Sequence, residues 1–343
     1  MNETMTGRER IVAALTGRTP DRVPRDYGAL PGFVRNHPGA IERIRAQYPP
    51  DVGDCGWRMP PGTVQGDPYA VGTYVDEWGC VFENVHGGII GQVKHPLVAA
   101  WSDIDQVRPP WHLLEQGFED VARACTTGPG FTLSPWPVQP FERLQFLRGT
   151  ETLFKDLLHQ PAGLLKLRDI VHEFNCAWVE RWCRTPVDAV FLADDWGTQH
   201  ALLISPRLWR AFFKPLYADY TRRIKAAGKF VYMHSDGFIR DILDDLIEIG
   251  VDAINAQVTC MDLAELQRRF AGRITFWGQM DRQHMLCFGT VAEARQAVHD
   301  FWRNLAGPGG SRVVCQMHIE PTARPENIMA VLEEFAALRP GSV

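Results

Sequence analysis

The sequence predicts an α/β protein that folds as a (β/α)8 barrel. From about residue 130 onward, short apolar runs of β type alternate with helical stretches, which indicates a parallel sheet. These runs are apolar throughout, as expected for strands that are covered on both faces. At least five such βα units follow one another, and no GxGxxG or P-loop motif opens their helices. The competing arrangement, a doubly wound open sheet, is therefore disfavoured.

The part before residue 130 differs in composition and has few long periodic segments. Residues 6–15 predict a short amphipathic helix that is capped by Thr6. Residues 18–115 are rich in Gly, Pro and Trp, which predicts irregular structure, short strands and loops over one end of the core. With no linker or repeat in view, we expect one domain over residues 1–343, in which 1–115 is an irregular part packed on the barrel.

Each predicted strand is followed by a predicted helix. The strands are expected at 130–134, 188–193, 229–234, 251–255, 273–278 and 312–317. The helices are expected at 149–184, 206–227, 238–249, 261–271, 290–305 and 325–338. In such a barrel the carboxyl ends of all strands meet at one rim, where active sites are built.

Composition and charge narrow the range of functions. The chain has 343 residues, of which 45% are hydrophobic, and its formal net charge of −5 with no Lys/Arg run argues against a nucleic-acid partner. The opening residues lack an apolar signal core, and no apolar run approaches the ~20 residues of a membrane span. We therefore expect a cytoplasmic protein without a membrane partner, whose eight scattered cysteines are reduced.

The run KFVYMHSD at 229–236 carries the strongest functional signal. Residues two apart in a strand point to the same face, so His234 and Asp236 are expected to project together at the carboxyl end of this strand. An imidazole beside a carboxylate suits a divalent metal such as zinc, or an acid/base pair.

Other strands also end in polar residues. Asp194 and Asp195 follow strand 188–193, and either one caps a helix or takes part in catalysis. Because neighbours in a strand point opposite ways, only one of the two can face the barrel mouth. Strand 312–317 is followed by His318 and Glu320, whose spacing repeats that of His234 and Asp236, although a surface loop is the competing interpretation.

Seven motifs occur in an order that is typical of one superfamily. They are RERIVAALTGRTPDRVP (8–24), DEWGCVFENVHGG (76–88), PFERLQFLRGTETLFKDL (140–157), DDWGTQHALLISPRLWRAFFKPLY (194–217), HSDG (234–237), GQMDRQHML (278–286) and RPENI (324–328). The chain thereby resembles the uroporphyrinogen decarboxylase superfamily, and within it the corrinoid-linked methyltransferases and their HSDG-type relatives. The resemblance covers nearly the whole chain and implies a (β/α)8 barrel with its pocket at the carboxyl ends of the strands.

The chain departs from both well-understood types in that superfamily. The decarboxylases carry an RQAGR-type motif that holds porphyrin carboxylates, whereas the corresponding PRDYGALPGF has Arg25 as its only basic residue. The thiol-methylating members hold zinc with His-x-Cys and a later Cys. Here His234 matches, Asp236 replaces the first Cys, and Cys315 is displaced from the position of the later one. Fewer thiolates make a harder, more Lewis-acidic site, which favours an oxygen substrate.

Three functions follow as hypotheses. The first is a zinc-dependent methyltransferase that demethylates a small methoxylated substrate and passes the methyl group to a corrinoid. The corrinoid would ride on a partner protein, because no DxHxxG motif is present. The second is a corrinoid-independent decarboxylase or other lyase, with Asp194 or Asp195 as general acid and His234 as its partner. The third is a non-catalytic barrel that binds a small ligand.

The residue assignments for these hypotheses are specific. The expected metal ligands are His234, Asp236 and one residue among Cys315, His318 and Glu320, although for Cys315 a buried core thiol is the competing interpretation. Substrate contacts are expected from polar or aromatic residues near the strand ends, namely Trp196, Gln199, Asn255, Gln257 and Gln279. The sequence leaves a homodimer open.

Overall fold

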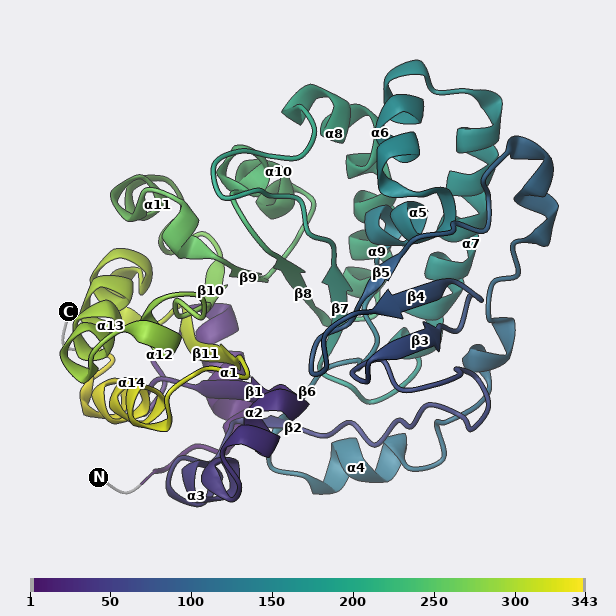
Figure 1. The fold of residues 1–343 in the computed structure, drawn as a ribbon. Coiled ribbons are helices and arrows are strands. Elements are labelled where there is room, and N and C mark those ends of the chain that lie inside the picture. Colours follow the sequence, from purple (N-terminus) through teal and green to yellow (C-terminus); the bar gives the residue numbers. More distant parts are fainter. Residues whose placement is uncertain (1–2, 342–343) are drawn as a thin grey trace.

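A curled parallel sheet forms the centre of the computed structural model, which describes residues 3–341 (Figure 1). Six strands are hydrogen-bonded in the order β1-β11-β10-β9-β8-β7. Their bounds are β1 Arg25–Ala29, β7 Ala189–Ala193, β8 Phe230–Ser235, β9 Ala253–Ala256, β10 Thr275–Trp277 and β11 Val313–Ile319.

Two further short strands close this sheet into a ring. Strand β2 (Val52–Gly53) pairs in parallel with β6 (Phe131–Thr132). Beside β6, a parallel bridge joins Leu133 to Ala189 of β7, and beside β2 the Asp51 amide donates to the Arg25 carbonyl of β1 at 2.7 Å. The ring therefore contains β1, β2 and β6 to β11, which confirms the predicted (β/α)8 barrel.

Helices surround this ring (Figure 1). Their bounds are α1 Gly7–Thr16, α2 Pro31–Asn36, α3 Ala40–Gln47, α4 Val121–Thr127, α5 Pro140–Arg148, α6 Thr150–His159, α7 Ala162–Cys183, α8 Pro206–Phe212, α9 Lys214–Ala226, α10 Leu243–Glu248, α11 Leu263–Phe270, α12 Met285–Phe288, α13 Val291–Leu305 and α14 Pro325–Ala337. Two helices predicted as single are split. Pro161 separates α6 from α7, and Pro215 lies in the first turn of α9, because proline cannot donate a backbone hydrogen bond within a helix.

The expectation that residues 1–115 only pack on the barrel is wrong in part, because β1 and β2 are barrel strands. Strand β1 was missed because its sequence, RDYGA, is not an apolar run. The remainder of this part includes a separate antiparallel sheet of β3 (Gly72–Val75), β4 (Val81–Asn84) and β5 (Gln92–Val93). This sheet lies over α5 (Figure 1), and the loop after β3 forms ion pairs with Arg143 of that helix.

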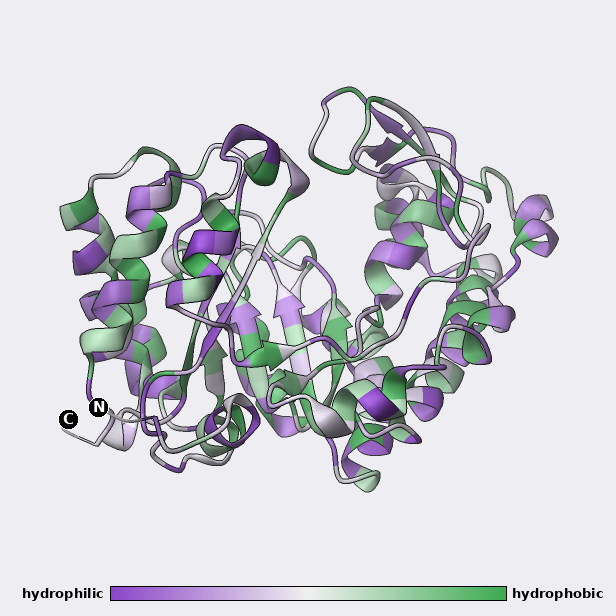
Figure 2. Ribbon diagram, turned by 90° about the horizontal axis from the view of Figure 1, so that it is seen from below, coloured by the Kyte–Doolittle hydropathy of each residue, from purple (hydrophilic) through white to green (hydrophobic). Residues whose placement is uncertain are grey.

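The core has an inner and an outer layer. The inner cluster fills the barrel and consists of Ile11, Ala14, Leu15, Phe131, Ala189, Tyr232, Ala253, Trp277 and Val314. Helix α1 contributes three of these residues and so plugs the amino-terminal end, where Thr275 donates to the Ala14 carbonyl at 3.1 Å. The other strand face packs against the surrounding helices. The strand bodies are largely hydrophobic, and some strand tips are hydrophilic (Figure 2). Strand β8, for example, ends in His234 and Ser235.

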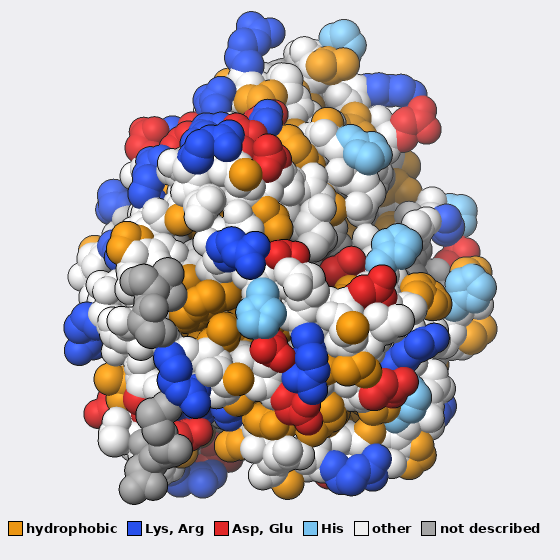
Figure 3. All heavy atoms as spheres, turned by 90° about the vertical axis from the view of Figure 1, so that its left-hand side faces the viewer, with side chains coloured by type: hydrophobic (Ala, Val, Ile, Leu, Met, Phe, Trp, Pro, Cys, Tyr) orange, Lys and Arg blue, Asp and Glu red, His pale blue; other side chains and the backbone are white. Residues whose placement is uncertain are grey.

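On the face that carries α13 and α14, acidic and basic side chains are interspersed rather than gathered into a basic patch (Figure 3). Ion pairs such as Arg295–Glu333 at 2.5 Å link the two helices there. Within residues 3–341, no helix has the length and apolar character needed to cross a membrane.

Candidate functional site

Strand alternation decides which polar side chains enter the barrel. On β8, Tyr232 belongs to the inner cluster, so His234 and Asp236 lie on the inner side, whereas Met233 packs outward. On β7, Phe191 packs against the inner cluster, so Asp195 has the inward register and Asp194 the outward one. The two neighbouring strands therefore bring Asp195, His234 and Asp236 to one place on the rim.

These three side chains form a compact group of metal-ligand type. One ligand atom from each lies within 4.8 Å of the others. The Nε2 atom of His234 is 3.5 Å from Oδ1 of Asp195 and 3.6 Å from Oδ1 of Asp236. One imidazole nitrogen and two carboxylate oxygens are a donor set that binds zinc or a similar divalent ion.

The turn after β8 holds Asp195 and Asp236 in a fixed relative position. Gly237 has a φ of +77°, and a Cβ built there would lie 2.2 Å from the carbonyl oxygen of Gly197. Only glycine permits this approach of the two loops. The Asp236 amide in turn donates to Oδ1 of Asp195 at 2.9 Å. The glycine of HSDG therefore fixes where Asp195 and Asp236 stand relative to each other.

Asn255 on β9 orients the histidine. Its Oδ1 lies 2.6 Å from Nδ1 of His234, so that nitrogen carries the proton and donates, and Nε2 faces the carboxylates. The Asn255 amide group donates to the Trp277 carbonyl and to Oε1 of Gln316 at 3.0 Å, which fixes its own orientation. A metal-ligating histidine commonly donates its other ring N–H to such a partner.

Arg282 closes the site on the other side. Its guanidinium pairs with Oδ2 of Asp236 and, at 2.5 Å, with Oε1 of Glu320. Gln279 accepts from Nε of Arg282 at 3.2 Å and donates to Oδ1 of Asp236 at 3.4 Å. The pairing with Arg282 occupies Oδ2 of Asp236 and leaves Oδ1 directed at His234.

The pKa values in this group respond to its burial and charge. Burial disfavours the imidazolium, but the hydrogen bond to Asp195 and the charge of Asp236 raise the pKa of His234 to about 9. Burial raises the pKa of Asp236 despite the attraction of His234. Burial also opposes ionisation of Asp195, yet its hydrogen bond with His234 holds its pKa below the ordinary value. Without a metal, His234 is thus an imidazolium held between carboxylates.

Asp194 does not reach this group. It is fully buried, and its carboxylate accepts from the amides of Phe141 (3.0 Å) and Glu142 (2.7 Å) at the start of α5, and from the Tyr217 hydroxyl. This carboxylate caps a helix that is distant in sequence, which is a structural task. Trp196 was expected to contact substrate, but it is fully buried and stacks on Phe141 with ring centroids 4.1 Å apart.

The three candidates for a further ligand on or after β11 also lie outside the group. Cys315 packs in the outer layer, because its register on β11 is opposite to that of Gln316. Burial there raises the pKa of its thiol. Glu320 is engaged by Arg282. His318 is inward-facing and half-buried, and burial lowers its pKa, but it does not belong to the group around His234.

The remaining expected substrate contacts lie around the group. Asn255 and Gln279 touch His234 and Asp236 directly, as described above. Oε1 of Gln257 accepts from the Gly237 amide at 3.0 Å and so supports the HSDG turn. Gln199 is exposed and contacts Gln283 at 3.3 Å.

Two carboxylates near the site were missed in the sequence. Burial, with the nearby charge of Asp195, raises the pKa of Glu142 at the start of α5 to about 7. Burial raises the pKa of Asp26 on β1 to about 6, although its Oδ2 accepts from the Trp277 indole at 2.7 Å. Glu142 stands in a helical motif and Asp26 in a strand that the apolar pattern did not reveal, so neither carried a signal of its own.

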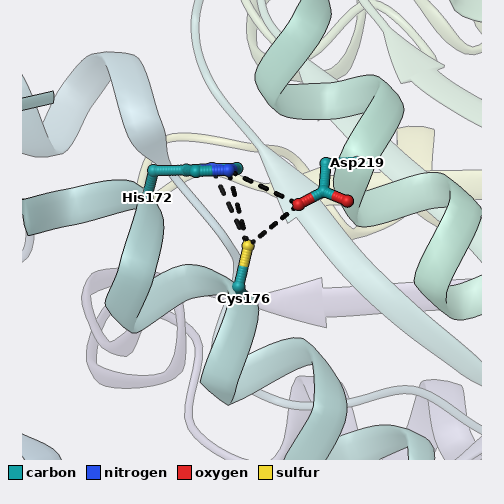
Figure 4. Close-up of side chains that lie close together, drawn as sticks. All are labelled: His172, Cys176 and Asp219. Atoms are coloured by element: carbon teal, nitrogen blue, oxygen red, sulfur yellow. Dashed lines mark hydrogen bonds and ion pairs between the residues drawn. The ribbon is translucent and has the colours of Figure 1, made fainter. Parts of the chain in front are cut away.

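A second group of metal-ligand type lies between α7 and α9 (Figure 4). Sγ of Cys176 is 3.6 Å from Nε2 of His172 and 3.3 Å from Oδ2 of Asp219. Asp219, however, already pairs with Arg222 and Arg223, and burial raises the pKa of the Cys176 thiol to about 12. Two guanidinium groups on the carboxylate and a neutral thiol make this group poorly suited to a cation.

The group at the rim fits a divalent ion better. Asp195, Asp236 and Glu320 supply three negative charges, and Arg282 offsets one of them. With His234 neutral, the remaining two charges balance a divalent ion. Three protein ligands also leave a position for water or substrate, as in catalytic zinc sites.

Comparisons with known proteins identify the fold and the family of the chain. A solved structure described as a methyltransferase from Methanosarcina mazei matches 96% of this chain and 98% of its own, with a TM-score of 0.69 and 18% identity. That identity supports the shared fold alone. A complex structure of a GH113 β-1,4-mannanase matches with a TM-score of 0.39 and 6% identity, too low to carry an argument. No curated protein sequence matches the chain. The family model described as Uroporphyrinogen decarboxylase (URO-D) matches residues 73–338, and the chain belongs to this family.

Proposed function

We propose that this protein is a metal-dependent methyltransferase that demethylates a small methoxylated substrate. The observation that carries the proposal is the convergence of Asp195, His234 and Asp236 within 4.8 Å at the mouth of the barrel. The fold shared with a methyltransferase structure is consistent with it. Asp195 replaces Cys315, His318 and Glu320 as the third ligand in the proposal, because strand register brings it to His234.

Each side chain around the proposed metal centre has a separate role. His234, Asp195 and Asp236 would hold a zinc or similar divalent ion, which as a Lewis acid would polarise the ether oxygen of the substrate. Asn255 keeps the proton of His234 on Nδ1, so Nε2 is the nitrogen that would bind the ion after losing its own proton. Arg282 holds Asp236 in place. Glu142, with a pKa of about 7, can return a proton to the oxygen from which the methyl group departs.

The methyl acceptor is proposed to be the cob(I)alamin form of a corrinoid that is carried by a separate partner protein. Porphyrin decarboxylation is disfavoured, because Arg25 is buried and stacks at 5.1 Å on Tyr48 instead of facing the barrel mouth. The segment that would offer guanidinium groups to porphyrin carboxylates therefore supplies none at the rim.

A specific observation supports a second candidate, a corrinoid-independent lyase or decarboxylase. Asp195 and His234 lie 3.5 Å apart, and in the absence of metal the histidine is protonated at neutral pH. An imidazolium next to a carboxylate is an acid/base pair. In this candidate Asp195, not Asp194, is the partner of His234.

Two measurements separate these functions. The purified protein is incubated with zinc, desalted and analysed for metal, and methyl transfer from methoxylated compounds to free cob(I)alamin is followed by absorbance. Zinc near one equivalent together with methylcobalamin formation supports the methyltransferase. A protein that retains no metal contradicts it and leaves the lyase. A protein that binds ligands without any turnover would point to the non-catalytic binding barrel.

A further inference from the structure

The wall of the barrel mouth that faces the candidate metal centre comes from β1. In the ring of strands, β1 and β8 are four strands apart in either direction, so they stand on opposite sides. Tyr27 packs in the outer layer, which gives Asp26 and Gly28 the inward register. These two residues of β1 therefore face His234 of β8 across the interior of the barrel.

Gly28 leaves this wall open. It is exposed, and a Cβ built on it would meet no atom within 4 Å. Its φ lies outside the left-handed region, so the backbone conformation does not demand glycine here. An eight-stranded barrel is usually just wide enough for its inward side chains to fill it. The missing side chain at Gly28 thus leaves room for a ligand opposite the metal centre.

Asp26 lies deeper in the same wall and offers a free oxygen. Its Oδ2 accepts from the Trp277 indole at 2.7 Å, and Trp277 belongs to the inner cluster that forms the floor. Its Oδ1 has no hydrogen bond or ion pair within residues 3–341, yet this atom keeps accessible surface. Helix α1 plugs the amino-terminal end of the barrel, so Oδ1 is reached from the mouth.

The described part of the chain brings no cation to this carboxylate. Arg25, which precedes Asp26, has the outward register and stacks on Tyr48 at 5.1 Å. Burial and the charge of Asp51 raise the pKa of Asp26 to about 6, so the group is mainly ionised at neutral pH. A half-buried carboxylate in this state is stabilised by a ligand with positively charged N–H donors. A ligand carboxylate would be repelled.

We propose that Asp26 and Gly28 form a subsite for the end of the substrate that is remote from the reacting group. Gly28 provides the space, and Asp26 binds a cationic N–H group, an amine in the simplest case. This inference rests on the proposed function, since it takes the metal centre as the place of reaction. It adds an amine to the substrate and gives the carboxylate of β1 a binding role.

Metal-anchored probes test the subsite without turnover. Alkyl hydroxamates that end in an ammonium group, and matched ones that end in a methyl group, are titrated into the zinc-loaded protein over a series of increasing chain lengths. The hydroxamate binds zinc, and the chain carries its other end across the mouth. For at least one length, calorimetry should show binding of the ammonium probe at least about tenfold tighter than that of its methyl counterpart. Absence of this preference at every length would overturn the assignment.

A matched pair of variants locates the contact. Asp26→Asn keeps an acceptor for the Trp277 indole but removes the charge, so the preference for ammonium should disappear. Asp281→Asn makes the same exchange in the loop after β10, where the side chain accepts from the Gln283 and His284 amides. This control should preserve the preference. A folded Asp26→Asn protein that keeps it contradicts the proposal, because attraction to the net negative charge of the chain would then explain the binding.

A second variant tests the space. Gly28→Val places a side chain in the opening, and long-chain probes should bind at least about tenfold more weakly. Acetohydroxamate, which reaches only the metal, should bind as to the wild type. Unchanged binding of the long probes would show that they do not use this space, and an equal loss for acetohydroxamate would show that the metal centre itself was disturbed. Either result overturns the role of Gly28.

The outcomes keep this inference apart from the proposed function. The same probes are titrated into the metal-free protein, since the contact of the ammonium group with Asp26 does not require zinc. A protein that retains no zinc but still prefers the ammonium probe contradicts the metal centre and supports the subsite. A protein that retains zinc and transfers methyl groups without this preference supports the methyltransferase and contradicts the role of Asp26.

Discussion

The Nδ1 atom of His234 lies 2.6 Å from Oδ1 of Asn255. This contact sets the tautomer of the histidine, because the amide oxygen can only accept. The nitrogen that faces Asp195 and Asp236 is thereby kept for a ligand.

Replacing Asn255 should weaken metal binding without removing it. In Asn255→Ala the imidazole loses its orienting partner, and the zinc affinity is expected to fall about 10- to 100-fold. A competition titration with a chromophoric chelator measures this. An affinity equal to that of the wild type would contradict the orienting role.

His234 and Cys315 should differ sharply as metal ligands. His234→Ala removes the only imidazole of the group, so zinc retained after desalting should fall close to zero. Cys315→Ala should retain zinc, because the thiol packs in the outer layer. Circular dichroism of both variants checks the fold, and loss of zinc in Cys315→Ala would show that the register argument is wrong.

The two neighbouring aspartates should separate stability from metal binding. Asp194→Ala leaves the Phe141 and Glu142 amides and the Tyr217 hydroxyl without their acceptor, so the free energy of unfolding should fall by about 3 kcal/mol or more. Asp195→Ala should change stability by less than about 1 kcal/mol but abolish zinc retention. Urea unfolding and metal analysis give both quantities, and the opposite pattern would exchange the two roles.

Zinc binding should release a proton at neutral pH. The pKa of His234 in the metal-free protein is raised to about 9, so at pH 7 the ring is charged and must lose a proton to bind. Affinity should therefore rise about tenfold per pH unit from 7 toward 9 and level off above it. Calorimetry in buffers of different ionisation enthalpy counts the protons, and a count near zero at pH 7 would contradict the imidazolium assignment.

Glu142 should make the metal-free protein less stable as the pH rises. Its pKa is raised from 4.5 to about 7 in the fold, so the protonated form is favoured there. Below pH 4.5 the residue is protonated in both folded and unfolded states and contributes nothing. Between pH 4.5 and about 7 the residue ionises in the unfolded state but stays largely protonated in the folded state. The free energy of unfolding therefore falls by up to about 3 kcal/mol relative to a protein with a neutral side chain at this position. Glu142→Gln should thus match the wild type near pH 4.5 and exceed it at pH 8 in denaturant unfolding, and an equal difference at both pH values would contradict this.

The sequence by itself determined the barrel. Apolar runs followed by helical stretches predicted six of the eight barrel strands, and period-two alternation placed His234 and Asp236 on one face of β8. These features are local, because a residue's neighbours in sequence dictate strand pattern and side-chain direction. Strand β1 escaped the prediction because its RDYGA sequence has no apolar run, and β2 because it is only two residues long.

Only the tertiary structure decided the site. The choice of Asp195 over Asp194, and of Gln316 over Cys315 as the inward residue, depends on strand register, and a shift of one residue exchanges the two faces. An apolar run that is buried on both faces carries no signal for that register. The meeting of Glu77 with Arg143, and of Glu142 with the rim, joins segments more than 50 residues apart. Such contacts arise from packing between elements, which the local pattern of either element does not encode.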